Sequence, residues 1–403
     1  MRRCPGRDTA DCEGSPGRSS SGVILRSTNT PREEVDRKVE RLASAAQDAG
    51  LRGVLLTTHW NFSWLTAGAT NRIDISREAG AGALLVSAGG RRYALANAIE
   101  MPRLADEVLA GLDFEPIEFA WVDERANPAF LVQRATALLS GPIGCDAVLG
   151  DAHHFETSLS RLRSALEPEE LRRYRALGAD AGRAVGSVLH SVPAGISERE
   201  VVREVAVSLL RANTRPLVLL AAADNRLLRH RHPVPTALVW ANRLMVAVCA
   251  ERDGLVVALS RLLSAGRPEA EMARRLTAAQ GVLADLLDAS LPGASAASLY
   301  QVAADGYARR GFAGEEARHH QGGLIGYRSR EWIAHPRSGE HVPTPAGAVA
   351  WNPSVTGTKV EETCLVTAGG VEVITSSPGW PSSTVTAQGR TLLLPDHLIL
   401  ESG

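Results

Sequence analysis

The sequence predicts an α/β (α+β) protein of two domains, and three observations support this prediction. The chain has 403 residues, whereas a typical domain has roughly 150. Hydrophobic residues make up 44% of the chain and the net charge is −1, which suffices for a buried core and excludes wholesale disorder. Short strand-like runs alternate with helical patterns up to about residue 150, and a second pattern starts near Leu166.

The composition excludes several classes of protein. No apolar run approaches the roughly 20 residues that span a membrane, and no apolar signal-peptide core lies near the start, so we expect a cytoplasmic protein without a membrane partner. The balance of 44 basic and 45 acidic residues argues against a nucleic-acid partner. The five cysteines are odd in number and widely spaced, which predicts neither a disulfide framework nor a zinc knuckle.

The N-terminal part predicts a leader and a small α/β domain over residues 31–160. Residues 1–30 are rich in Ser, Gly and Arg and lack aromatic residues, so we expect a disordered leader or a start codon assigned too early. Strands are expected over 53–57 and 82–87. A helix before them is predicted by apolar residues at helical spacing, which are Val35, Val39, Leu42 and Ala46.

The second domain is assigned to residues 165–380, with a C-terminal tail over 381–403. Pro168 suits a first helical turn, and Ser197 with Glu200 forms the capping box of the next helix. Apolar runs on either side of an Asp-Gly turn predict a β-hairpin over 244–261. The other expected elements are helices at about 268–289 and 296–310 and strands over 348–351, 358–366 and 371–374.

Polar residues interrupt this apolar frame at 229–233 (RHRHP), in the hairpin, at 319–323 (HHQGG) and around 352–362. Their order and spacing resemble the superfamily of methionine aminopeptidase, prolidase, aminopeptidase P and creatinase, whose members have the pita-bread fold. The resemblance covers about residues 33–376. Residues 53–57 (GVLLT) and 61–66 (NFSWLT) are similar to the N-terminal domain of creatinase and prolidase, and residues 166–171 (LEPEEL) resemble the linker to the pita-bread domain.

The resemblance implies five metal-ligand positions, of which this chain keeps two. Metal-dependent members hold two divalent metals with two Asp, one His and two Glu. Placed by the hairpin turn, the Asp positions fall on Ala247 and Ala258, which cannot coordinate a metal. The His position matches His320, and the Glu positions fall on Asn352 and Glu361. Because a dication needs anionic ligands to offset its lost hydration, we expect no metal and no cofactor.

Creatinase works without a metal, and among these families the residue pattern of the chain resembles the metal-free, creatinase-like members most. His230 falls on the catalytic His of creatinase. This chain has His-x-x-Pro-Val where creatinase has His-x-Pro-Val, so the alignment can shift locally and His232 is the alternative. An imidazole suits proton transfer because its pKa lies near neutrality. The two catalytic carboxylates of creatinase fall on Ser260 and Asn352, so creatine is not the expected substrate.

A candidate site follows from these positions. Glu361 could orient an imidazole or bind a substrate amine, and Asn352 could donate to a developing oxyanion. Cys249 is either a nucleophile or a small core residue. Lys359 is one of two lysines in the chain. The expected catalytic residues are His230, His320 and Glu361, and the expected substrate-binding residues are Asn352, Ser260, Cys249, Lys359, His232 and Tyr327.

Three functions fit this site. The first is a metal-independent, creatinase-like hydrolase that cleaves an amide-like or amidine-like C–N bond in a small molecule or short peptide-like substrate. The second is a non-catalytic pita-bread binding protein. The third is an Xaa-Pro aminopeptidase or prolidase with an atypical metal site built from His320, Glu361 and a third group such as Cys249. The resemblance also implies a homodimer.

Overall fold

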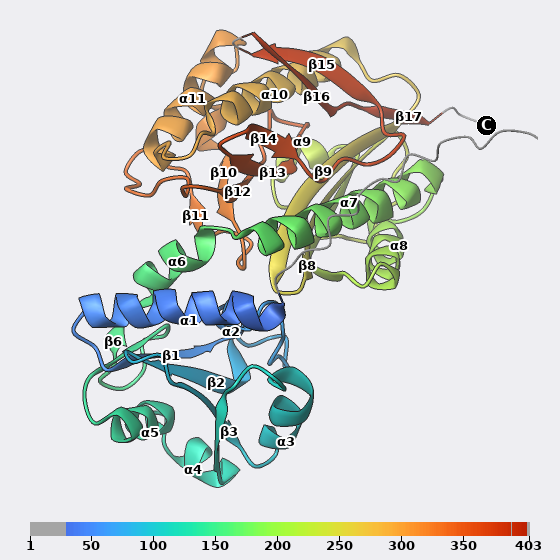
Figure 1. Ribbon diagram of the computed structural model, residues 1–403. Coiled ribbons are helices and arrows are strands. Elements are labelled where there is room, and N and C mark those ends of the chain that lie inside the picture. Colours follow the sequence, from blue (N-terminus) through green and yellow to red (C-terminus); the bar gives the residue numbers. More distant parts are fainter. Residues whose placement is uncertain (1–29, 388, 401–403) are drawn as a thin grey trace, which may run out of the picture.

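The computed structural model describes residues 30–387 and 389–400 and consists of two domains (Figure 1). Both combine helices with β-sheets, so the mixed α/β fold class is confirmed. The leader expected over residues 1–30 lies, apart from Thr30, outside the described residues. Within the described part of the chain, no helix has the length and apolar character needed to cross a membrane.

The N-terminal domain is built on one six-stranded sheet. Its strands are β1 (Gly53–Thr58), β2 (Ala79–Ser87), β3 (Arg92–Asn97), β4 (Glu115–Phe119), β5 (Ile143–Cys145) and β6 (His153–His154). Its helices are α1 (Pro31–Asp48), α2 (His59–Leu65), α3 (Met101–Arg103), the π-helical turn η1 (Leu104–Val108), α4 (Trp121–Ala126), α5 (Phe130–Leu139) and α6 (Glu156–Ser164). The strand order is β4-β3-β2-β1-β5-β6, and β1 is antiparallel to β2 and parallel to β5.

Strand β1 is buried on both faces, which explains its apolar run over residues 54–56. Val54 and Leu56 share a hydrophobic core with Val35 of α1, whereas Leu55 shares another core with Val132 of α5. Because successive strand residues point to opposite faces, α1 and α5 cover opposite sides of the sheet (Figure 1). The predicted first helix and first strand are both confirmed.

The C-terminal domain contains two main sheets, ordered β17-β9-β8-β7 and β11-β10-β12-β13-β14. The strands are β7 (Arg215–Ala223), β8 (Arg243–Arg252), β9 (Leu255–Ala265), β10 (Gly322–Ile325), β11 (Trp332–Ile333), β12 (Gly347–Trp351), β13 (Glu362–Thr367), β14 (Gly370–Val373), β15 (Ser382–Ala387), β16 (Arg390–Pro395) and β17 (Leu398–Leu400). The helices are α7 (Pro168–Ser191), α8 (Glu198–Arg211), α9 (Arg226–Arg229), α10 (Ala270–Ala289), α11 (Ala296–Arg309) and the 3₁₀ turn η2 (Glu315–Ala317).

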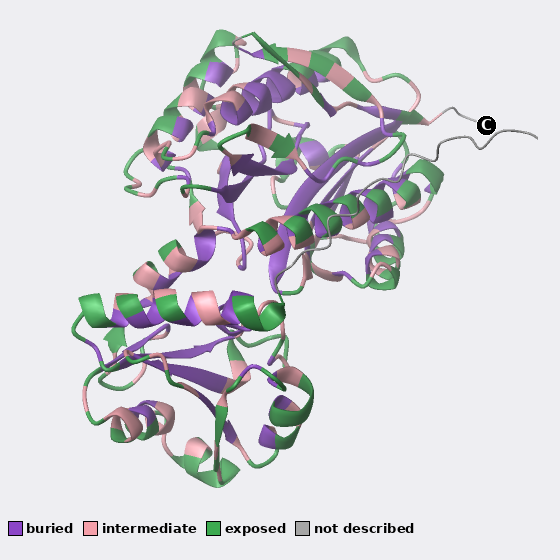
Figure 2. Ribbon diagram, viewed as in Figure 1, coloured by how far each residue is buried: buried purple, intermediate pink, exposed green. Residues whose placement is uncertain are grey.

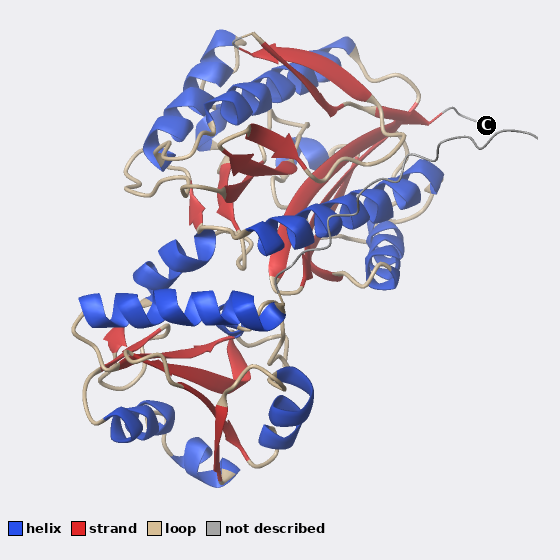
Figure 3. Ribbon diagram, viewed as in Figure 1, coloured by secondary structure: helices blue, strands red, loops and turns tan. Residues whose placement is uncertain are grey.

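Two pairs of helices enclose these sheets (Figure 3). Helices α7 and α8 share one hydrophobic core with β8 and β9, and α10 and α11 share a second core with β12 and β13. Figure 2 shows the corresponding pattern, with buried strands inside and exposed helix faces outside. The sheets are joined where the Ser260 amide donates to the Glu361 carbonyl at 3.2 Å. This junction brings the expected site residues of the two sheets together.

The predicted hairpin forms β8 and β9, and its turn also contacts the N-terminal domain. Asp253 and Gly254 both have positive φ, at 53° and 75°, as a tight two-residue hairpin turn requires. A Cβ at Gly254 would lie 2.5 Å from Cβ of Ser63 in α2, so no larger residue fits there without displacement. The Asp-Gly turn therefore serves both the hairpin and domain packing.

Two predicted segments differ from the structure. The strand expected over 358–366 begins only at Glu362, because residues 358–361 form a loop in which the Val360 amide donates to the Pro353 carbonyl at 3.1 Å. The segment treated as a C-terminal tail forms the hairpin of β15 and β16, and β17 then pairs in parallel with β9. Its strands pack on the domain because Leu394 and Leu398 are buried.

Lys38 of α1 is buried at the boundary between the two domains. Its ammonium donates to Glu34 Oε1 at 2.7 Å, to Glu170 Oε1 at 2.8 Å and to the Trp64 carbonyl at 2.8 Å. Glu170 lies on α7, in the second domain, and also accepts a hydrogen bond from the Tyr327 hydroxyl at 2.7 Å. All three ammonium protons are therefore used, and the amine separates two buried carboxylates.

We expect Lys38→Met to lower the free energy of unfolding by roughly 3–5 kcal/mol, because removing one partner of a buried ion pair leaves uncompensated charge. Denaturant unfolding followed by circular dichroism measures this change. The matched control is Arg172→Met, which removes an ion pair with Glu169 in which Arg172 is 67% exposed, and it should change stability little. Equal losses of unfolding free energy in the two variants would contradict the proposal that the buried ion pairs of Lys38 stabilise the fold.

Glu34 should make the fold sensitive to acid. Burial opposes ionisation of this carboxyl group, but hydrogen bonds and charges from Arg173 and Lys38 prevail and lower its pKa from 4.5 to about 2. A lowered pKa in the folded state gives stability that is complete above pH 4.5 and lost as the pH falls towards 2. Between these values the unfolding free energy should fall less steeply in Glu34→Gln than in the wild type. Parallel curves would refute this assignment.

Candidate functional site

A cavity of about 280 Å³ opens beside the four-stranded sheet of the C-terminal domain. Strands β7 and β8 supply its apolar wall, and loops around β10 and before β13 supply most of its polar wall. The lining residues are Val218, Leu220, His232, Ala247, Val248, Cys249, His320, Ser329, Arg330, Asn352, Lys359 and Glu361. We call this space the central cavity.

Strand pairing explains the apolar wall. Ala247 of β8 lies opposite Leu220 of β7 on one side and Ser260 of β9 on the other. Cys249 pairs with Ala258 in the next row of the same face. Directly opposed residues in neighbouring strands point to the same side of a sheet, so the methyl groups of Ala247 and Ala258 share a face with the Cys249 thiol.

Glu361 is the buried carboxylate of the central cavity, and three groups bind it. Lys359 Nζ lies 3.0 Å from its Oε2, Arg330 Nη2 lies 3.1 Å from its Oε1, and the Ser260 hydroxyl donates to its Oε2 at 2.6 Å. Burial opposes ionisation, but the charges of Lys359 and Arg330 and the Ser260 hydrogen bond lower the pKa of Glu361 from 4.5 to about 2. The carboxylate is therefore charged at neutral pH and fully engaged.

These residues do not fit the two-metal site that the resemblance implies. Ala247 and Ala258 present methyl groups, and Asn352 presents a neutral amide. Glu361 is the remaining carboxylate at these positions, and both of its oxygens already bind side-chain donors. A dication at Glu361 would meet the ammonium of Lys359, and like charges at this range repel each other strongly.

The thiol of Cys249 is held in its neutral form by burial. Burial raises the pKa of its thiol from 9.0 to about 11. The side chain is therefore a neutral thiol at physiological pH, which disfavours the thiolate that nucleophilic attack requires. Cys249 contributes to the apolar wall of the central cavity.

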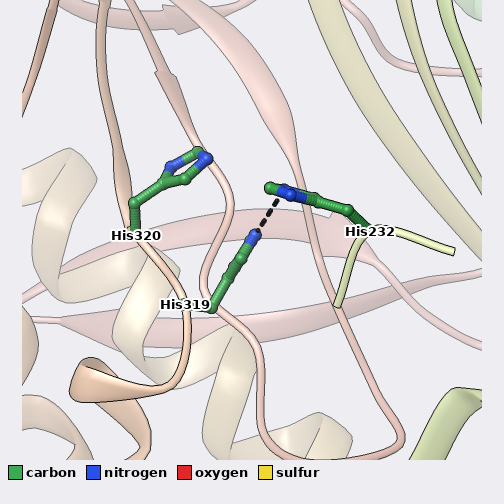
Figure 4. Close-up of side chains that lie close together, drawn as sticks. All are labelled: His232, His319 and His320. Carbon is green, nitrogen blue, oxygen red and sulfur yellow. Dashed lines mark hydrogen bonds between the residues drawn. The ribbon is translucent and has the colours of Figure 1, made fainter. Parts of the chain in front are cut away.

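Three imidazoles lie together next to this wall, and we call them the histidine cluster (His232, His319 and His320; Figure 4). His232 comes from the loop between α9 and β8, and the other two come from the loop before β10. The Nε2 atoms of His232 and His319 lie 3.1 Å apart, which is hydrogen-bonding distance. The ring centroids are separated by 4.7 to 5.5 Å.

The environment keeps the histidine cluster uncharged. Burial, aided by Arg330, His232 and Lys359, lowers the pKa of His320 from 6.5 to about 4. Burial also lowers the pKa of His232 and strongly lowers that of His319, and the positive charge of Lys359 adds to both effects. The central cavity therefore places neutral imidazoles beside the basic side chains of Lys359 and Arg330.

Most of the residues expected at the site meet at the central cavity. Ser260 lies opposite Ala247 on the same face of the sheet, and its hydroxyl donates to Glu361 of the cavity. The expected residues that line the cavity are His232, His320, Cys249, Asn352, Lys359 and Glu361.

Two expected residues are not part of this site. His230 is exposed at the end of α9 and borders a separate, small depression beside Leu227 and Met245. Tyr327 is 1% exposed and its hydroxyl donates to Glu170 at the domain boundary, so the substrate-binding role expected for it needs correction. The loop carries His232, and not His230, to the central cavity, which makes His232 the better candidate for the catalytic imidazole.

Sequence reasoning missed two important residues. Arg330 binds Glu361, but the chain contains 44 basic residues of which only two are Lys, so a single Arg gives no signal. His319 was part of the conspicuous His-His pair, but adjacent histidines are common in loops, and only the fold shows both rings beside His232.

Comparisons with known proteins agree with this architecture. Residues 169–368 match the model of metallopeptidase family M24, and no curated protein matches the chain. The Xaa-Pro dipeptidase of Bacillus anthracis is 19% identical with a TM-score of 0.69, over 91% of this chain and 100% of that one. The dipeptidase PepE of Mycobacterium ulcerans is 20% identical with a TM-score of 0.70, over 86% and 97%.

The same fold also occurs in a protein that is not described as a peptidase. The N-terminal domain of the FACT complex subunit SPT16 from chickpea is 11% identical with a TM-score of 0.64, over 86% of this chain and 96% of that one. Such identities establish the fold alone. Together with the family match, the shared fold identifies residues 169–368 as a domain of metallopeptidase family M24, within the pita-bread superfamily.

Proposed function

We propose that the central cavity hydrolyses an amide-like or amidine-like C–N bond of a small molecule or short peptide-like substrate, without a metal ion. The observation that supports this proposal is the ion pairing of Glu361 with Lys359 and Arg330 next to neutral imidazoles. Hydrolysis of such a bond needs a group that moves a proton and positive groups that stabilise the negative charge of the transition state. Side chains of this cavity supply both.

His232 takes the role of general base and acid in this proposal. As a neutral imidazole it accepts a proton from water while the water oxygen attacks the carbon of the C–N bond. It then returns this proton to the leaving nitrogen as the C–N bond breaks. His232 is exposed at the cavity, so substrate and water can reach it.

The other polar residues stabilise the negative charge that develops on the substrate. The Gly322 amide donates to His320 Nδ1 at 3.2 Å, so the single proton of the neutral His320 ring is on Nε2 and can be donated. Lys359 and Arg330 add fixed positive charge. Glu361 acts as a positioning residue, because its two oxygens hold these cations in place.

A non-catalytic binding protein is the second candidate. It is favoured by the loss of three of the five family ligand positions, at Ala247, Ala258 and Asn352, while the cavity of about 280 Å³ is retained. A prolidase with an atypical metal site is less well supported, because both oxygens of Glu361 already bind donors and burial raises the pKa of the Cys249 thiol. For each of these functions we propose a homodimer, as the resemblance implies, and a location in the cytoplasm.

His232→Ala should lower kcat by roughly 100-fold to 10,000-fold, which is the usual contribution of a general acid–base group. The assay uses a panel of amides, amidines and Xaa-Pro dipeptides in the presence of a chelator. His230→Ala is the comparison, two residues away but outside the central cavity, and it should retain most of the activity. Loss of activity in His230→Ala alone would restore His230 as the catalytic imidazole.

Mn²⁺ should not raise the melting temperature of the purified protein. An ion that binds the folded state stabilises it by mass action, but Glu361 is the one carboxylate at the five family ligand positions, and it is paired with Lys359 and Arg330. Differential scanning fluorimetry with and without Mn²⁺ measures the shift. A saturable increase would contradict this expectation and would show that the folded chain binds Mn²⁺.

A further inference from the structure

The histidine cluster has a geometry that the proposed hydrolysis does not require. One ligand-capable nitrogen from each of the three rings lies within 4.8 Å of the other two. Metal–nitrogen bonds of about 2.1 Å in a tetrahedral site would place the ligand nitrogens about 3.4 Å apart. The difference is small, and His232 is exposed on a loop, so rotation of its side chain can close it.

We propose that the histidine cluster binds one divalent transition-metal ion of the Zn²⁺, Co²⁺, Ni²⁺ or Cu²⁺ class. Imidazole suits these ions, and three imidazoles with a free fourth position form a known coordination arrangement. The site differs from the two-metal site of the family, because only His320 occupies one of the family's ligand positions. His232 and His319 are additional ligands of this chain.

Hydrogen bonds behind His319 hold its ring in a suitable orientation. His319 is 7% exposed, and its Nδ1 lies 3.3 Å from the Ser354 hydroxyl. Arg231 Nη1 donates to the same hydroxyl at 2.9 Å, and Arg231 is itself held by Glu315 and by Thr356. With Nδ1 engaged there, Nε2 of His319 is directed towards His232. Bonds of this kind orient imidazoles for metal binding.

Two features oppose binding and limit the affinity. Lys359 and Arg330 carry positive charges close to the cluster, and Glu361 offsets only one of them. His320 Nδ1 accepts the Gly322 amide proton, so coordination through Nε2 requires the ring proton to leave or to move to Nδ1 at the expense of that bond. We therefore expect an ion that exchanges readily and that a chelator removes.

Metal binding would compete with the proposed hydrolysis. The reaction requires the free electron pair of His232, and coordination would occupy it. Zn²⁺ should therefore inhibit turnover. This inhibition rests on the proposed function, whereas the binding of the ion does not.

Calorimetric titration of the metal-free full chain with Zn²⁺ tests the site, and the visible absorption of bound Co²⁺ reports its coordination geometry. We expect one ion per chain. His232→Ala, which removes an exposed side chain, and His319→Ala should each weaken binding by at least about tenfold. The control His335→Ala removes an exposed histidine outside the cluster and should bind as the wild type does.

Absence of saturable one-to-one binding, or equal dissociation constants for the wild type and His232→Ala, would overturn the proposed site. Weaker binding in His335→Ala alone would place the ion elsewhere and would overturn it as well. These outcomes do not depend on turnover. A protein that binds Zn²⁺ through the cluster but hydrolyses no substrate would refute the proposed function and leave the metal site intact.

Discussion

The central cavity depends on compensation of the buried charge of Glu361. A carboxylate removed from water is costly unless opposite charges and hydrogen-bond donors surround it. Here Lys359, Arg330 and Ser260 provide them, so the compensation belongs to the chain itself and does not depend on the uptake of an ion. The same arrangement leaves two fixed cations beside neutral imidazoles, which is the electrostatic basis of the proposed chemistry.

The boundary between the domains follows the same principle with the charges reversed. There a single ammonium, that of Lys38, lies between Glu34 and Glu170. The chain uses Arg at all but two of its 44 basic positions, and both lysines are buried in ion pairs. An ammonium is a compact charge with three donors, whereas a guanidinium is planar and larger, so Lys suits these confined places.

The fold could largely be predicted because local signals agreed with one another. The capping box of Ser197 and Glu200 predicts α8, and the structure shows both of its hydrogen bonds. The Asp-Gly turn likewise predicts the central hairpin. The strand expected from residue 358 was extended too far, because residues 358–361 have strand-like composition but turn away from β13. That bend is set by contacts with the Pro353 loop, which are not visible in a local pattern.

The site was predicted less completely, because loops build it. The hairpin face and Glu361 follow from spacing and strand alternation. The choice between His230 and His232 depends on the path of one loop, and Arg330 is placed by a loop that folds over the cavity from the other sheet. The path of a loop is set by tertiary contacts, so no repeating pattern in the sequence predicts it. Tyr327 shows the same difficulty, because its hydroxyl is directed to Glu170 instead of the cavity.

The burial of both lysines has a consequence for chemical labelling. Lys38 is 0% exposed and Lys359 is 5% exposed, and each amine is held by a carboxylate. Reagents directed at primary amines can therefore reach Lys359 through the central cavity, but Lys38 only after the two domains separate. Modification of Lys38 thus serves as a marker of unfolding at the domain boundary.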